Sequence, residues 1–245
     1  MFCYCQSLIQ APKLPATTLA KYCYAYMFFS CLQLLTAPEL PAMTLTEYCY
    51  DHMFPQCYAL TAAPELPATT LASNCYAYMF NVCKFTTPPS LPATTLAYRC
   101  YYRMFHGADI TTAPALPATT LAISCYEEMF YGTDITTAPL LPATSLTEGC
   151  YRNMFSSCYS LTTLPTLPVT TLVSACYYGM FNNCGLIKLS TTQTGEYQNT
   201  YRIPTSGTGT TVTDALTDMF INTGGTFTGT PTINTIYYTS NTIIS

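Results

Sequence analysis

Apolar residues recur along this chain in one pattern that returns every 25 or 26 residues. The phrase Leu-Pro-Ala-Thr-Thr-Leu, with small changes, begins at seven leucines: Leu14, Leu40, Leu66, Leu91, Leu116, Leu141 and Leu167. The steps between them are 26, 26, 25, 25, 25 and 26 residues. A fixed period in this range is the signature of a repeat protein, in which each unit packs only against its neighbours. The pattern therefore predicts a solenoid of stacked units.

One half of each unit has the spacing of a short amphipathic helix. In the third unit the small and apolar residues lie four apart, at Leu71, Cys75, Met79 and Cys83, with a second such pair at Tyr76 and Phe80. Residues four apart share one face of a helix. A threonine before this stripe, Thr69 or Thr70, is a plausible N-cap.

The other half of each unit has the composition of a short strand. This half, for instance residues 60–66, carries one to three threonines in each of six units, and its first position is apolar in all six: Leu34, Leu60, Phe85, Ile110, Ile135 and Leu161. A proline column follows and is expected to end the strand, because proline cannot donate to a sheet ladder. We therefore predict an α/β repeat solenoid that is leucine-rich-repeat-like, with a short parallel strand plus a short helix in each 25–26-residue unit.

The pattern divides the chain into two regions. Residues 1–189 form the predicted solenoid, which starts in the middle of a repeat and holds the seven units. Residues 190–245 are expected to contain a degenerate last repeat at Ala215–Phe220 and a β-rich C-terminal cap, with a Thr/Gly-rich loop at 205–213. Because Met1 falls within a repeat unit, we expect the true N-terminal cap and any signal peptide to be missing.

Composition and charge exclude several classes of partner. Among the 245 residues, 49% are hydrophobic and 8% are charged, with a net charge of −4. No basic stripe is present to neutralise phosphates, so nucleic acid is not an expected partner. No stretch approaches eighteen consecutive apolar residues, so no membrane span is predicted in this chain.

The fourteen cysteines are interpreted as buried, reduced thiols. Five units hold a pair eight residues apart, and eight helical residues span about 12 Å, beyond the roughly 7 Å Cα limit for a disulfide. In two units the second cysteine is replaced by Ala108 or Thr133, which a small buried position tolerates. Disulfides between neighbouring repeats remain an alternative. The tyrosine column is predicted to be a packed ladder, with a ligand-stacking strip as its alternative.

No arrangement of residues predicts catalysis, a metal site or a cofactor. His52 and His106 lie in variable columns without a nucleophile nearby in the sequence. The adjacent carboxylates Glu127 and Glu128 are interpreted as a solvated face, because neighbouring helical residues do not face one another. We therefore expect a protein that is not an enzyme and that needs no cofactor.

The order of these columns resembles a known family. The Cys-x-x-Leu step, the proline after the strand and the aromatic-cysteine helix, recurring in register over about residues 1–190, are similar to the BspA-like leucine-rich repeats of bacterial surface proteins. The unit here is longer, and Met-Phe stands where the family has Ala-Phe. The resemblance implies a cell-surface or secreted, extracellular protein that functions in adhesion and protein binding.

A binding function should lie in the columns that vary between units, since the repeated columns are needed for packing. The candidate surface residues are Lys13, Glu39, Glu65, Ser90, Tyr102, Arg103, Glu127, Glu128 and Arg152. We predict a non-enzymatic repeat protein that contacts a host or microbial surface protein or glycan through an extended face. The alternative is a purely structural spacer or stalk that displays another domain.

Overall fold

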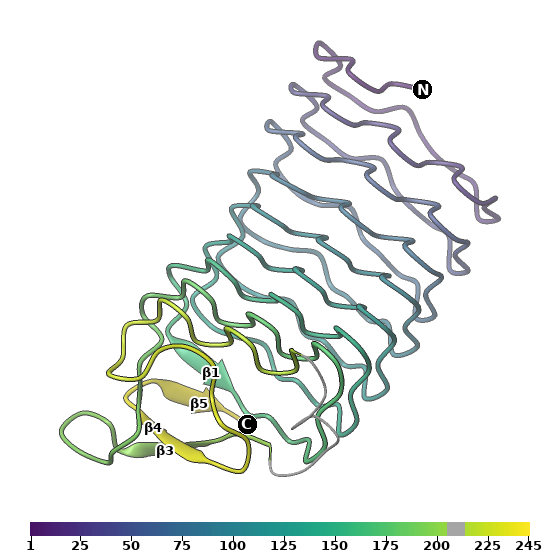
Figure 1. The fold of residues 1–245 in the computed structure, drawn as a ribbon. Coiled ribbons are helices and arrows are strands. Elements are labelled where there is room, and N and C mark those ends of the chain that lie inside the picture. The colour runs from purple at the N-terminus through teal and green to yellow at the C-terminus, as the bar shows by residue number, and fades with distance from the viewer. Residues whose placement is uncertain (205–213) are drawn as a thin grey trace.

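The chain winds as a stack of similar coils that ends in a group of short strands (Figure 1). The computed structural model describes residues 1–204 and 214–245, and the segment predicted to be a loop, 205–213, lies outside them. In Figure 1 the coils run from the N-terminus to the C-terminal end, where the strands gather beside the last coils. Each coil corresponds to one sequence period, because hydrogen-bonded partners in adjacent coils lie one period apart.

The predicted helix-plus-strand solenoid of leucine-rich-repeat type is wrong. The described residues contain no helix, and their regular secondary structure consists of five short strands: β1 (Thr163–Pro165), β2 (Leu189–Ser190), β3 (Asn199–Arg202), β4 (Ile236–Thr239) and β5 (Thr242–Ile244). Among these strands of the described residues, β1 alone lies in a segment that the sequence predicted to be the strand of one of the seven units. In the corresponding segments of other units, isolated parallel bridges such as Gln10 with Thr36 join neighbouring coils.

Consecutive β-turns occupy the segment that was predicted to be helical. In the third unit, alternate backbone N–H groups donate to the carbonyl three residues earlier, at 3.1 to 3.3 Å; the donors are Cys75, Ala77, Met79, Asn81 and Cys83. The intervening N–H groups donate to carbonyls of the next coil at 2.8 to 3.0 Å; these donors are Asn74, Tyr76, Tyr78, Phe80 and Val82. We call this segment of each coil the turn side. Its backbone donors therefore bond within the coil and between coils in alternation.

A left-handed residue at every fourth position keeps this chain of turns regular. In the same unit Asn74, Tyr78 and Val82 have φ values of 55°, 54° and 56°. Each is the third residue of a turn, the position where a type II turn requires positive φ. The side chains consequently repeat every four residues, which is close to the 3.6-residue helical period. This coincidence is the physical reason why the sequence pattern predicted a helix.

Two aromatic ladders run through the core of the stack. Phenylalanine rings from Phe2 to Phe220 stack with centroids 5.4 to 6.0 Å apart, one ring per coil. Tyrosine rings from Tyr24 to Tyr177 form a second ladder at 5.8 to 5.9 Å. Apart from the half-buried Tyr24, the rings of the tyrosine ladder are buried. Each buried ring contributes about 1.5–3 kcal/mol through removal of apolar surface from water.

The cysteines fill small spaces beside these ladders. Eleven of the fourteen are buried, and all are free thiols. The second cysteine of a unit donates to a phenylalanine carbonyl of the preceding coil, as from Cys57 Sγ to Phe28 O at 3.2 Å and from Cys83 Sγ to Phe54 O at 3.1 Å. Burial raises the pKa of the Cys49 thiol to about 11 and that of Cys57 to about 12. These thiols therefore act as protonated, largely apolar filling.

The C-terminal region covers the last coils. Residues 215–220 stack on the preceding coil, with Tyr177 N donating to Ala215 O at 2.9 Å and the rings of Phe181 and Phe220 5.4 Å apart. Beyond them, β4 lies between β2 and β3 in an antiparallel sheet, and β5 pairs in parallel with β1. The end of the stack is thus occupied by the chain itself.

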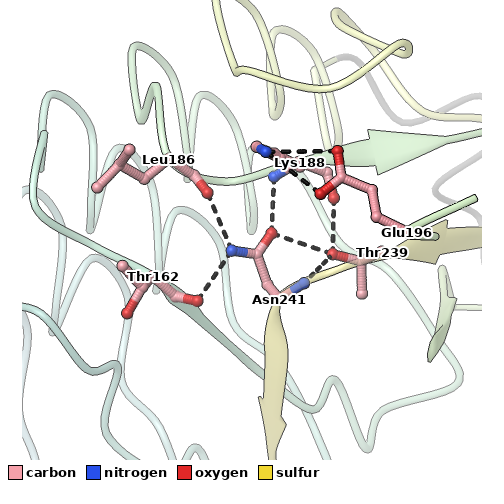
Figure 2. A network of polar contacts seen from close by, with 6 residues as sticks. All are labelled: Thr162, Leu186, Lys188, Glu196, Thr239 and Asn241. Carbon is pink, nitrogen blue, oxygen red and sulfur yellow. Dashed lines mark hydrogen bonds and ion pairs between the residues drawn. The ribbon is translucent and has the colours of Figure 1, made fainter. Parts of the chain in front are cut away.

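The amide of Asn241 joins this sheet to the coils (Figure 2). Its Nδ2 donates to Thr162 O and to Leu186 O, each at 2.9 Å. Its Oδ1 accepts from Lys188 N at 2.7 Å and from Thr239 Oγ1 at 3.0 Å. Because Asn241 is buried and both ends of its amide are hydrogen-bonded, we interpret it as a structural clamp.

Candidate functional site

The structure places the predicted surface residues on two separate regions. Lys13, Glu39 and Glu65 lie among the prolines at the end of the threonine-rich half. Ser90 occupies the same column in the next coil and is exposed, but it does not line the hollows described below. The remaining candidates, Tyr102, Arg103, Glu127, Glu128 and Arg152, lie together on the turn side.

Two adjoining hollows form a shallow groove over the N-terminal coils. The first, of about 320 Å³, lies between residues 10–15 and 36–41 of neighbouring coils. The second, of about 340 Å³, lies between residues 37–41 and 64–67 and shares four lining residues with the first. We call the combined feature the proline groove, since its walls include six prolines: Pro12, Pro15, Pro38, Pro41, Pro64 and Pro67.

The prolines also explain why a groove forms at this place. On one side of it Thr61 N donates to Leu35 O at 3.2 Å, and on the other a parallel bridge joins Thr44 to Thr70. Between these points, no backbone hydrogen bond joins residues 37–41 to residues 63–67 in the described part of the chain. Proline has no N–H and cannot continue a ladder. The coils therefore meet here without backbone hydrogen bonds, leaving polar backbone groups unpaired.

The charge of the groove changes along the stack. Lys13, Glu39 and Glu65 are exposed, and within residues 1–204 and 214–245 none of them forms an ion pair. In the following coils the same column is uncharged: Ser90, Ala115, Leu140 and Thr166. In this column, the charged side chains of one lysine and two glutamates therefore lie only in the three N-terminal coils.

On the turn side, arginines and carboxylates from three coils form a network. Arg103 Nε lies 2.7 Å from Glu128 Oε2. Arg99 and Arg152 approach Glu127 from the preceding and following coils, at 3.5 and 4.0 Å. Glu127 and Glu128 are 5% and 8% exposed, so the interpretation of this pair as a solvated face is wrong. In the turn conformation both side chains contact arginines of neighbouring coils.

Aromatic rings surround this network. Arg103 donates to Tyr78 Oη at 3.1 Å, and its guanidinium carbon lies 5.6 Å from the Tyr78 ring centre and 5.2 Å from that of Tyr102. Burial raises the pKa of Tyr102, as does its hydrogen bond with Tyr78. Burial and the positive charge of Arg103 lower the pKa of His106. A cation enclosed by carboxylate and ring faces gains from both interactions.

Sequence reasoning missed three members of this network: Arg99, Tyr78 and His106. Their signal was present, because Arg99 and Arg103 lie four residues apart and Tyr78 lies one period before Arg103. Reading the segment as a helix gave no reason to expect contacts between neighbouring coils at these positions. Arg99, Tyr78 and Arg103 are in fact left-handed turn residues, with φ values of 50°, 54° and 52°. At such positions the backbone N–H donates to the next coil, so equivalent residues of neighbouring coils lie beside one another.

The two regions differ in the groups that they leave without partners. In the network on the turn side, the carboxylates of Glu127 and Glu128 already contact arginines. Elsewhere on that side His52 Nδ1 contacts the neighbouring Asp51 Oδ1 at 2.8 Å, and no hydrogen bond among the described residues joins this pair to a nucleophilic side chain. The described residues contain no group of three histidine, cysteine or acidic side chains arranged to hold a metal ion. The proline groove offers apolar walls, unpaired charges and unpaired backbone groups.

Comparisons with protein-family models, curated proteins and solved structures find no match to this chain. The resemblance to BspA-like repeats therefore stays a prediction based on the sequence columns. Among the described residues, no helix is long and apolar enough to cross a membrane.

Proposed function

We propose that this chain is a non-enzymatic binding protein that contacts a surface protein or glycan through an extended face of its coil stack. The observation that supports this proposal is the proline groove, where three exposed charges and unpaired backbone groups lie along adjacent coils. The repeated phenylalanine and tyrosine columns are largely buried in the two ladders, so those rings are not available to a partner.

The groove suits a partner better than the network on the turn side does. Glu127 and Glu128 already contact arginines, and both are buried. A ligand there would have to replace existing ion pairs at a cost in desolvation. In the groove, Lys13, Glu39 and Glu65 can gain partners without losing any.

A location at the cell surface or in the extracellular medium is part of the proposal. It rests on the resemblance of the repeat columns to BspA-like proteins, whose members function in adhesion. The coil stack is compatible with this role because a rigid, elongated surface can present one groove to a large partner.

A binding panel tests the proposed function. The whole chain is immobilised and exposed to mucin, matrix proteins and microbial surface proteins, and saturation is measured by biolayer interferometry. We expect saturable binding to at least one of them, weakened by the variant Glu39→Gln/Glu65→Gln. Glu148→Gln, which changes an exposed carboxylate on the turn side, is the matched control. Absence of saturable binding across the panel would contradict the proposal.

A structural spacer is the second candidate, and the continuous ladders favour it. Phenylalanine and tyrosine rings stack without interruption across the coils, which gives the molecule a rigid long axis. A spacer needs this rigidity but no binding surface. It predicts that the charge variant in the groove behaves like the unaltered chain in every binding assay.

A further inference from the structure

We propose that the proline groove binds an extended peptide segment that carries basic side chains. This inference rests on the proposed function and adds the chemical class of the ligand. Three features of the groove carry it: unpaired backbone groups, walls of proline without aromatic rings, and carboxylates in adjacent coils.

The unpaired backbone favours a ligand that is itself a peptide. In the described structure the backbone N–H groups of Lys13, Glu39 and Glu65 donate no hydrogen bond. The equivalent group in the last complete coil, Thr166 N, donates to Ile244 O at 2.8 Å, in the extended strand β5. Polar backbone groups require partners when water is displaced. An extended peptide supplies donors and acceptors of the kind that β5 supplies at the end of the stack.

The walls of the groove select an extended backbone over a sugar. The lining residues include six prolines and no aromatic side chain, so a sugar ring finds no aromatic face on which to stack. Proline rings are rigid and apolar, and contact with them orders few protein side chains. A ligand that is already extended, as proline-containing peptides are, loses little conformational entropy on binding.

The charges select basic side chains. Glu39 and Glu65 occupy one column of adjacent coils, and both lack an ion-pair partner among the described residues. A lysine or arginine of the ligand placed there relieves the repulsion between the carboxylates. At the N-terminal end of the groove Lys13 repels basic side chains, so the basic residues of a bound peptide should lie toward Glu39 and Glu65. Because all three side chains are exposed, the attraction is sensitive to salt.

The test measures binding of a fluorescein-labelled Arg-Pro repeat peptide to the whole chain by fluorescence anisotropy, at low and at physiological ionic strength. We expect saturable binding that weakens with salt. The variant Glu39→Gln/Glu65→Gln should weaken it roughly tenfold, since each exposed ion pair is worth up to about fivefold. The control Glu148→Gln should leave the affinity unchanged, and a Glu-Pro repeat peptide should not bind.

A change in the opposite direction sharpens the test. Ser90→Glu adds a carboxylate in the next coil of the same column and should tighten binding of the Arg-Pro peptide a few-fold. If the Arg-Pro peptide fails to bind, or binds equally well to the Glu39→Gln/Glu65→Gln variant, the inference is overturned. The proposed function survives that result if the chain still binds a member of the panel, and it fails separately if nothing in the panel binds.

Discussion

On the turn side of each coil, alternate backbone N–H groups reach the neighbouring coil at 2.7 to 3.2 Å, whereas in the described part of the chain no backbone hydrogen bond joins residues 37–41 to residues 63–67 in the proline groove. The turn side also carries the stacked phenylalanine and tyrosine rings. The groove side carries prolines and unpaired charges. Stability and binding capacity are therefore concentrated on different sides of one repeated unit.

This difference follows from local chemistry. Each turn provides one N–H for its own closure and one for the next coil, so the turn side leaves few backbone groups unpaired. Each proline removes a donor and interrupts the ladder. The same unit thus produces a closed side and an open side, and the open side is where a partner can find unpaired groups.

The largest expected effect comes from removing a ring of the ladder on the turn side. Phe80 is fully buried and stacks between Phe54 and Phe105 at 5.8 and 5.7 Å. Phe80→Ala should lower the free energy of unfolding by about 3–5 kcal/mol, measured by urea titration. Glu39→Gln in the groove should change it by less than about 0.5 kcal/mol. Equal losses from the two variants would remove the distinction between the sides.

The second-largest effect is expected at high pH, which should lower the free energy of unfolding through the buried thiols of the turn side. The pKa of the Cys49 thiol is raised by burial from 9.0 to about 11, so the unfolded chain loses this proton first. Stability is fully present below pH 9 and is lost as the pH rises toward 11. The slope of unfolding free energy against pH should be smaller in Cys49→Ala. An identical slope in the two proteins would show that Cys49 does not contribute.

The network on the turn side gives a smaller effect. Glu128→Ala leaves Arg103 and its neighbours without their closest carboxylate, at 2.7 Å in the unaltered chain. We expect a loss of about 1–3 kcal/mol in unfolding free energy, because a partly buried charge loses its partner. Glu148→Ala, at an exposed position on the same side, serves as the control. Equal, negligible effects would mean that the network does not stabilise the coils.

The repeat period and the buried columns could be predicted from the sequence, because packing requires the same apolar residue in every coil. The conformation of the turn side could not, since residues four apart share a face in a helix and also in this chain of turns. A signal against the helix was present in Gly107, Gly132 and Gly149, which lie at left-handed positions of the turn side. Asn74 and Asn153 occupy such positions as well, and asparagine tolerates positive φ.

The candidate site was predictable in part. The column of Lys13, Glu39 and Glu65 was identified from its variation, and these residues lie together in the groove. Its unpaired backbone could not be inferred, because whether the N–H groups of Lys13, Glu39 and Glu65 find acceptors depends on how neighbouring coils meet. The burial of Glu127 and Glu128 was missed for a related reason: their arginine partners belong to other coils.

The most direct test of the turn conformation is the sign of the stability change in Val82→Gly. Val82 has a φ of 56°, a left-handed conformation that costs a β-branched residue about 1–2 kcal/mol and costs glycine little. The equivalent residue in the next coil is Gly107, with a φ of 65°. The chain of turns predicts that Val82→Gly raises the free energy of unfolding by about 1 kcal/mol in a urea titration. A helix at this position predicts a loss of about 0.5–1 kcal/mol, and that result would contradict the turn structure.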